Sequence, residues 1–138
     1  MGKKEMAESF AYEKHYGQLD DNQQEYIKHP IQVANIVKLI TDDEDVICAA
    51  YLHDTIENTK TTYQELKDMF GYRIADLVLE VTHEGNKTEG YTFPRLHSRE
   101  AILIKFADRL SNLSRMETWS ERRKLDYIAK SSFWKMKT

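Results

Sequence analysis

Leu52-His53-Asp54-Thr55-Ile56-Glu57-Asn58-Thr59 is the stretch that most strongly indicates the fold of this 138-residue sequence. It follows the apolar run 46–52, so His53 and Asp54 are predicted to lie at the inner end of a buried helix. Burying a carboxylate beside an imidazole is costly unless a partner compensates, and a divalent cation is a natural compensator. Adjacent His and Asp at this position therefore favour a metal site over a packing role.

Two further residues supply ligands of the same kinds. His29 lies 24 residues before His53, and Asp108 lies 54 residues after Asp54. Asp108 interrupts a helix pattern that is otherwise apolar on most faces, so its carboxylate is expected to face a cation or a polar cleft. Taken alone, His29 is typical of a core or surface histidine, and Asp108 of a carboxylate paired with a neighbouring basic side chain. The ordered set of four favours one shared metal site.

Two imidazoles with two carboxylates suit Mn²⁺ or Fe²⁺, and Zn²⁺ is a further candidate. Such an ion can lower the pKa of bound water and polarise a phosphoryl group. Glu57 follows Asp54 by three residues and is predicted on the same helix face, where it could orient or deprotonate water; the alternative is a solvent-facing acid. Asn112 follows Asp108 by four residues, and its amide can donate and accept hydrogen bonds toward a nucleotide.

The composition is that of an ordinary globular domain, with 41% hydrophobic and 31% charged residues and a net charge of -3. The mixed charges form no basic patch of the kind that binds nucleic acid duplexes. No apolar run is long enough for a membrane span, and the first residues lack a secretory signal, so cytoplasmic residence is expected. The length predicts one domain over residues 1–138. Cys48, the single cysteine, is expected to be buried.

The apolar spacing is helical nearly throughout, and no strand is predicted. We expect an all-α bundle of about six to seven helices. Thr62 and Glu65 are spaced as a capping box, and Gly17 is a suitable helix stop. The expected helices cover residues 4–16, 30–40 with Pro30 first, 42–54, 62–70, 72–81, from 94 or soon after to 113, and 121–133, and a polar loop covers 85–92.

Longer segments around these residues resemble the HD-domain superfamily of metal-dependent phosphohydrolases, and within it the small single-domain alarmone hydrolases of RelA/SpoT type. The resemblance runs from about His15 to Leu113 and is carried by residues 15–18, 26–30, 50–59, 70–71, 81–82 and 105–113.

This resemblance implies an all-helical HD fold and hydrolysis of the 3′-pyrophosphate of guanosine tetra- or pentaphosphate. It places Asn112 in the nucleotide pocket. It implies Mn²⁺ held by four ligands, which are His29, His53, Asp54 and Asp108.

Two features depart from the pattern of the alarmone hydrolases. Those enzymes carry Glu-Asp where this chain has Glu57-Asn58, and an Asn amide cannot act as a base near neutral pH, although it can position water. They also carry basic residues in the loop where this chain has Leu19-Asp20-Asp21. Lys87 is a candidate for supplying positive charge to the substrate instead.

The leading hypothesis is a metal-dependent phosphohydrolase that acts on a small pyrophosphorylated nucleotide, with guanosine 3′,5′-bis(diphosphate) the first substrate to try. Glu57 would orient or deprotonate the attacking water, and Asn58 would assist by hydrogen bonding. The acidic loop keeps a second hypothesis open, in which the substrate is another nucleotide or a phosphomonoester. Asn58 motivates a third, a sensor that binds a nucleotide without efficient turnover. The sequence does not indicate an oligomeric state.

Overall fold

The computed structural model describes residues 2–20, 23–82, 84–86, 90–92 and 96–113. Within these ranges the chain is a bundle of helices with one short hairpin, which confirms the predicted all-α class. The elements are α1 Lys3–Lys14, α2 Lys28–Lys38, α3 Glu44–Leu52, α4 Thr55–Asn58, α5 Tyr63–Phe70, α6 Tyr72–Glu80, β1 Glu84–Asn86, β2 Gly90–Thr92 and α7 Arg99–Leu113. The helix predicted over residues 121–133 lies outside the described residues.

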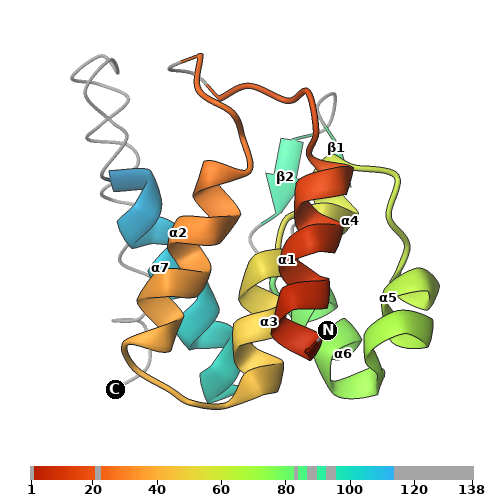
Figure 1. Ribbon diagram of the computed structural model, residues 1–138, viewed down its shortest axis with the longest axis vertical. Helices are drawn as coiled ribbons and strands as arrows, with labels where there is room; N and C mark the ends of the chain where they lie inside the picture. Colours follow the sequence, from red (N-terminus) through yellow and green to blue (C-terminus); the bar gives the residue numbers. More distant parts are fainter. Residues whose placement is uncertain (1, 21–22, 83, 87–89, 93–95, 114–138) are drawn as a thin grey trace.

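Helix α3 is the centre of the bundle. All of its residues from Val46 to Leu52 are buried, as expected for a helix that is apolar on every side. Helices α1, α2, α6 and α7 pack against it, and α2 also packs against α7 (Figure 1). This packing carries the C-terminal end of α3, with His53 after it, into the interior between α2 and α7.

The core is built from the apolar faces of these helices. Its largest fully buried apolar side chains come from five different helices and include Val33, Leu52, Leu66, Ile74 and Ile104. Burial of one such side chain contributes roughly 1.5–3 kcal/mol. The core therefore holds α2, α3 and α7 in a defined relation, which is what any site between them requires.

Helix α5 begins and ends where local sequence signals predict. The Thr62 hydroxyl accepts a hydrogen bond from the Glu65 N–H at 3.1 Å, which is the N-terminal half of a capping box. Gly71 ends α5 with a φ of 94°, a conformation that a residue with a side chain rarely adopts. Because α6 starts directly afterwards at Tyr72, Gly71 sets the sharp turn between the two helices.

The helix expected over residues 42–54 is two residues shorter at each end, and a short helix that was not expected follows it. Helix α3 ends at Leu52, and the separate short helix α4 begins at Thr55. Side chains take up the carbonyls at the break: the His53 Nδ1–H donates to the Ala50 oxygen at 2.8 Å, and the Thr55 hydroxyl donates to the Leu52 oxygen at 2.7 Å. The predicted end at Asp54 was two residues too late, because such side-chain bonds compete with the helical backbone pattern.

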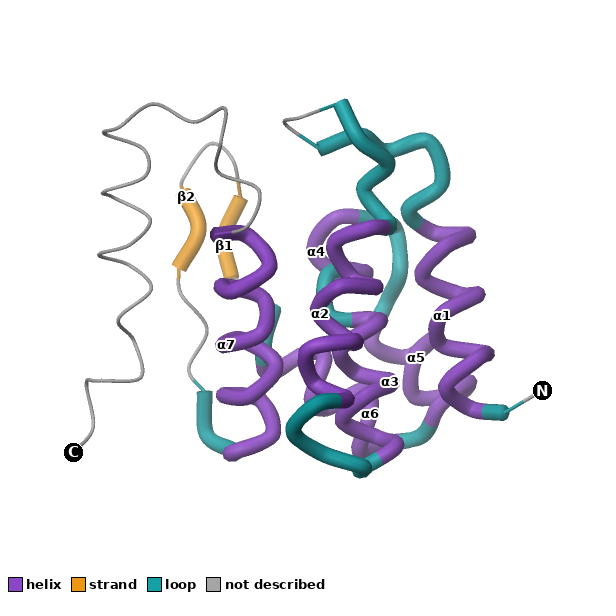
Figure 2. The backbone as a smooth tube through the Cα atoms, turned by 60° about the vertical axis from the view of Figure 1, so that its left-hand side comes forward, coloured by secondary structure: helices purple, strands orange, loops and turns teal. Residues whose placement is uncertain are grey.

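The segment predicted as a polar loop over residues 85–92 contains a strand pair. Strands β1 and β2 are antiparallel, with Glu84 opposite Thr92 and Asn86 opposite Gly90. Three-residue strands are too short to show an alternating apolar pattern, so no pattern in the sequence indicated them. Figure 2 shows the hairpin and α1 at opposite sides of the helices.

Two helices start at other residues than expected. Helix α2 begins at Lys28, so Pro30 is its third residue, a position in the first turn where no backbone N–H is needed. Helix α7 begins at Arg99, after Ser98, whose hydroxyl accepts from the Ala101 N–H at 3.0 Å.

None of the helices in the described ranges combines the length and hydropathy that a bilayer crossing requires.

Candidate metal centre

Four titratable side chains meet between α2, α7 and the junction of α3 with α4. Each offers one ligand atom, and these atoms all lie within 4.8 Å of one another. The junction contributes two residues, and each of the two helices contributes one. They are the four ligands predicted from the sequence, namely His29, His53, Asp54 and Asp108.

The short distances show that the ligand atoms share a centre. His29 Nε2 lies 2.8 Å from Asp108 Oδ1 and 3.6 Å from Asp54 Oδ2. His53 Nε2 lies 3.1 Å from the same Asp54 oxygen and 3.3 Å from the same Asp108 oxygen. Two imidazole nitrogens and two carboxylate oxygens are a donor set that divalent first-row metals accept, so the cluster could hold such an ion.

Both imidazoles are oriented by a bond at their other nitrogen. His53 Nδ1–H donates to the backbone oxygen of Ala50. His29 Nδ1 lies 2.8 Å from Ser111 Oγ, and the Ser111 hydroxyl donates its own proton to Gln32 Oε1 at 2.7 Å, so it accepts from His29. Because each Nδ1 atom is engaged outside the cluster, a cation would bind Nε2 of each ring, in place of the proton that Nε2 shares with the carboxylates.

The electrostatics of the cluster keep its carboxylates ionised. Burial alone would raise the pKa of Asp108, but hydrogen bonds from His29 and His53 hold it well below its usual value. Burial acts likewise on Asp54, where the charge of His53 and its hydrogen bond outweigh burial and lower the pKa. For His53, burial lowers the pKa, but the two carboxylates outweigh it and raise the pKa to about 10. The two ionised carboxylates therefore supply the negative charge that would attract a divalent cation, while the charge on His53 offsets part of it until a cation takes the place of its Nε2 proton.

Asp108 has both of the partners that its sequence context suggests, a polar cluster and a neighbouring basic side chain. Its Oδ1 atom faces the two imidazoles, and its Oδ2 atom lies 3.5 Å from the ammonium of Lys105, which is 3% exposed. One carboxylate thus contacts the two imidazoles through one oxygen and the buried Lys105 ammonium through the other. The base also limits the carboxylate to one orientation, which favours a stable ligand geometry.

Three of the predicted catalytic and substrate-binding residues lie on α4 and α7, which border the cluster. Glu57 is half-buried on α4, and Asn58 is exposed at the end of the same helix. Asn112 is half-buried on α7, one turn after Asp108. Their roles in catalysis and substrate binding stay predictions. Lys87 lies outside the described residues.

Three residues near the cluster were not singled out from the sequence. Ser111 and Gln32 orient His29, and the Tyr26 hydroxyl donates to Asp54 Oδ2 at 2.6 Å. Ser111 follows Asp108 by three residues on α7, so helix periodicity was the available signal for it. Gln32 follows His29 by three residues on α2, so the same signal was available for it. Tyr26 carried no such signal, because it lies before α2 and its contact with Asp54 depends on packing.

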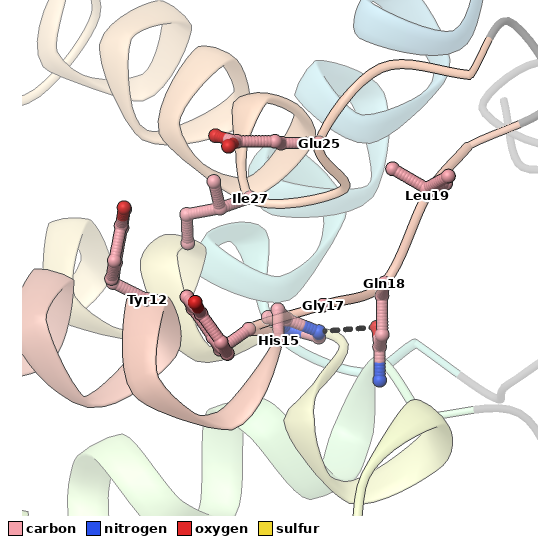
Figure 3. A pocket seen from close by; sticks show the side chains of 8 residues that line it. Tyr12, His15, Gly17, Gln18, Leu19, Glu25 and Ile27 are labelled. Atoms are coloured by element: carbon pink, nitrogen blue, oxygen red, sulfur yellow. Dashed lines mark hydrogen bonds between the residues drawn. The ribbon is translucent and has the colours of Figure 1, made fainter.

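A pocket opens beside the segment that links α1 to α2 (Figure 3). At its wall, the buried His15 forms a 2.9 Å hydrogen bond through Nδ1 with Gln18 Oε1. Burial lowers the pKa of His15, so its ring is neutral near neutral pH. The pocket does not include the four cluster residues; it is lined by Tyr12, His15, Tyr16, Gly17, Gln18, Leu19, Glu25 and Ile27.

Residues 7–91 match the profile of a known family, described as HD domain, and this span contains three of the four clustered ligands. The chain belongs to the HD-domain family. HD-domain hydrolases bind divalent metals, which agrees with a His and Asp cluster that could hold one. The fourth residue of the cluster, Asp108, comes from α7, beyond the matched span.

Several curated relatives of this HD-domain protein carry one name, guanosine-3′,5′-bis(diphosphate) 3′-pyrophosphohydrolase. The MESH1 protein of Danio rerio is 41% identical over 136 residues, which cover 87% of this chain and 75% of that protein. MESH1 of Xenopus tropicalis is 39% identical over 138 residues, covering 88% and 76%. The Aquifex aeolicus (strain VF5) protein is 38% identical over 127 residues, and the match spans 86% of this chain but 18% of that longer protein.

A solved structure supports the same relationship. It belongs to a study described as "A metazoan ortholog of SpoT hydrolyzes ppGpp and plays a role in starvation responses". The superposition has a TM-score of 0.81 at 29% sequence identity and covers 96% of this chain and 83% of the other. The HD-domain chain is thus homologous to small SpoT-type hydrolases in sequence and in fold.

Proposed function

We propose that this chain is a metal-dependent 3′-pyrophosphohydrolase of guanosine 3′,5′-bis(diphosphate). The observation that carries the proposal is the convergence of His29, His53, Asp54 and Asp108 in a chain whose relatives bear that activity in their names. The donor set supports Mn²⁺ as the ion, with Fe²⁺ and Zn²⁺ as alternatives. The proposal includes a single domain over residues 1–138, a small nucleotide as the partner, and cytoplasmic residence.

The proposed reaction divides the work among the residues of the site. A divalent ion, when bound, would polarise a phosphoryl oxygen and lower the pKa of water. Glu57 would orient the attacking water and receive its proton, and Asn58 would assist by hydrogen bonding. The water oxygen then bonds to the phosphorus attached at the ribose 3′ oxygen. The bond to that 3′ oxygen breaks, the oxygen takes up a proton, and pyrophosphate leaves.

Asn112 and Lys87 complete the proposal on the substrate side. The Asn112 amide can both donate and accept, which suits the edge of a nucleobase or the hydroxyls of a ribose. Its position one turn after Asp108 supports this role. Lys87 would place a positive charge against the phosphates, as the sequence suggests.

The test is pyrophosphate and phosphate release from a panel of nucleotides, with Mn²⁺ added and the metal content of the same preparation measured. Release from guanosine 3′,5′-bis(diphosphate) is expected for the parent chain. Asp54→Ala is expected to abolish both metal content and turnover, because it removes a ligand and half of the carboxylate charge at the centre. Turnover by Asp54→Ala at the parent rate would show that the site is misplaced.

The acidic loop favours a second candidate, hydrolysis of another nucleotide or of a phosphomonoester. The Asp20 carboxylate accepts the Gln24 N–H at 3.0 Å, so it stabilises its own loop and remains negative there. An ionised aspartate in this loop would repel a polyphosphate bound next to it. The same panel separates the candidates, since the preferred substrate is the one with the highest kcat/KM.

A sensor that binds a nucleotide without efficient turnover is the third candidate, and Asn58 motivates it. Tight binding without release of pyrophosphate or phosphate from any member of the panel would favour the sensor. In that case a carboxylate introduced by Asn58→Asp is expected to raise turnover. An unchanged rate in that variant would remove the motivation for the sensor.

A further inference from the structure

The hydroxyl of Tyr26 links the metal cluster to Asn58. It lies 2.6 Å from Asp54 Oδ2 and 3.1 Å from Asn58 Nδ2. A phenol has one proton to donate, and an ionised carboxylate can only accept, so this proton goes to Asp54. The Tyr26 oxygen then accepts from the Asn58 amide. The three side chains form a directed series from Asn58 through Tyr26 to a ligand of the cluster.

The ring of Tyr26 is held in place from two sides. Its centroid lies 4.9 Å from the imidazole of His15 and 5.9 Å from that of His29, and the contact with His29 is edge-on. The His29 N–H also donates to the Tyr26 carbonyl at 3.0 Å, just before α2. The hydroxyl therefore reaches Asp54 from a ring whose position is set by packing.

Asn58 is held through its backbone. The Gln18 amide donates to the Asn58 carbonyl at 3.0 Å, and the other end of the Gln18 side chain bonds to the buried His15 (Figure 3). The Asn58 N–H donates to the Asp54 carbonyl at 2.9 Å. These bonds fix the end of α4 against the segment after α1, so the Asn58 amide faces the Tyr26 hydroxyl.

We propose that Tyr26 is a positioning residue, which holds Asp54 toward the metal, and that Asn58 keeps the Tyr26 proton directed at Asp54 by acting only as a donor. The inference rests on the proposed metal-dependent function and deepens it. This donor role gives a physical reason for an asparagine at position 58. An aspartate there would offer Tyr26 a second acceptor and compete with Asp54 for the same proton.

The test is the affinity for Mn²⁺, measured by calorimetry on the full chain without substrate. Tyr26→Phe keeps the ring and removes the hydroxyl, and it is expected to weaken Mn²⁺ binding about 10-fold or more, as other losses of a bond to a metal ligand do. Asn58→Asp is expected to weaken Mn²⁺ binding in the parent chain. In the Tyr26→Phe background, Asn58→Asp is expected not to weaken Mn²⁺ binding, because the hydroxyl for which the two carboxylates would compete is absent.

Two matched controls separate this effect from general ones. Tyr63→Phe removes another hydroxyl that donates to an aspartate, Asp76, at the surface of α5 and α6. Asn35→Asp adds one negative charge on the exposed side of α2. Both are expected to leave the Mn²⁺ affinity within about twofold of the parent. Far-UV circular dichroism of each variant shows whether it is folded.

Four outcomes decide the inference. Unchanged or tighter Mn²⁺ binding by Asn58→Asp in the parent chain overturns it, and this comparison stands even if Tyr26→Phe fails to fold. Equal weakening by Asn58→Asp with and without the Tyr26 hydroxyl also overturns it. Mn²⁺ binding with the expected pattern but no hydrolysis of any nucleotide supports the inference and contradicts the proposed function. A parent chain that binds no metal contradicts both.

Discussion

At the scale of single residues, the cluster depends on side chains that bind no metal themselves. Ser111 is the clearest case, because its hydroxyl accepts a hydrogen bond from His29 Nδ1–H and donates one to Gln32 Oε1. Such partners set the tautomer and the rotation of a ligating imidazole. The position of His29 Nε2 at the centre is thus a property of several residues together.

Ser111→Ala is expected to weaken Mn²⁺ binding about 10- to 100-fold, because His29 loses the acceptor that orients its ring. Competition with a chelator of known affinity would measure the change. Ser9→Ala, at an exposed position on α1, is the matched control and should leave the affinity unchanged. Equal affinities for Ser111→Ala and the parent would show that His29 needs no such partner.

The buried thiol gives a second prediction at this scale. Burial raises the pKa of Cys48 to about 12, and the side chain is fully covered on α3. Since the thiolate is the reactive form, the native protein is expected not to react with a disulfide reagent at pH 8 over the time in which the unfolded chain reacts fully. Absorbance of the released thiol measures both rates. Comparable rates in buffer and in denaturant would contradict the burial.

At the scale of elements, the break between α3 and α4 is the feature that makes the site. A continuous helix would advance each residue by about 100° around its axis. The break instead brings the imidazole of His53 and the carboxylate of Asp54 to the same side, 3.1 Å apart. The bonds of His53 and Thr55 to α3 carbonyls stabilise this arrangement.

The start of α5 provides a test of a local signal. Thr62→Ala removes the acceptor for the Glu65 N–H and is expected to lower the free energy of unfolding by about 1 kcal/mol. Urea denaturation would measure it. Thr62→Ser keeps the hydroxyl and should retain most of the stability. A loss as large for serine as for alanine would point to the methyl group in place of the cap.

At the scale of the whole molecule, the cluster ties together segments that are distant in the sequence. His29 comes from α2, His53 and Asp54 from the α3–α4 junction, and Asp108 from α7. An unfolded chain does not bring these ligands together. A bound metal should therefore stabilise the folded chain as a whole.

Removal of the metal with a chelator is expected to lower the Tm of the parent protein. Binding at 100 times the Kd stabilises a folded protein by about 2.7 kcal/mol. Differential scanning calorimetry with and without Mn²⁺ measures the shift. Asp54→Ala should show no dependence of Tm on Mn²⁺, and a shift equal to that of the parent would place the stabilising ion elsewhere.

The helical class, the order of the longer helices and the identity of the four clustered residues could all be predicted from the sequence alone. Helical spacing is a local pattern, and an acid or imidazole in an apolar run needs a compensating partner wherever the chain folds. The same local view missed the break after Leu52, because that break depends on which acceptor the side chains of His53 and Thr55 reach.

Only the tertiary structure decided how the cluster is held. Tyr26 meets Asp54 across 28 residues of sequence, and His29 meets Ser111 across 82. No spacing rule covers such contacts, because they arise from the packing of α2 against α7 and of the segment before α2 against α4. Hydrogen bonds act over about 3 Å, so a directed series such as Asn58, Tyr26 and Asp54 exists only once packing has brought the three together.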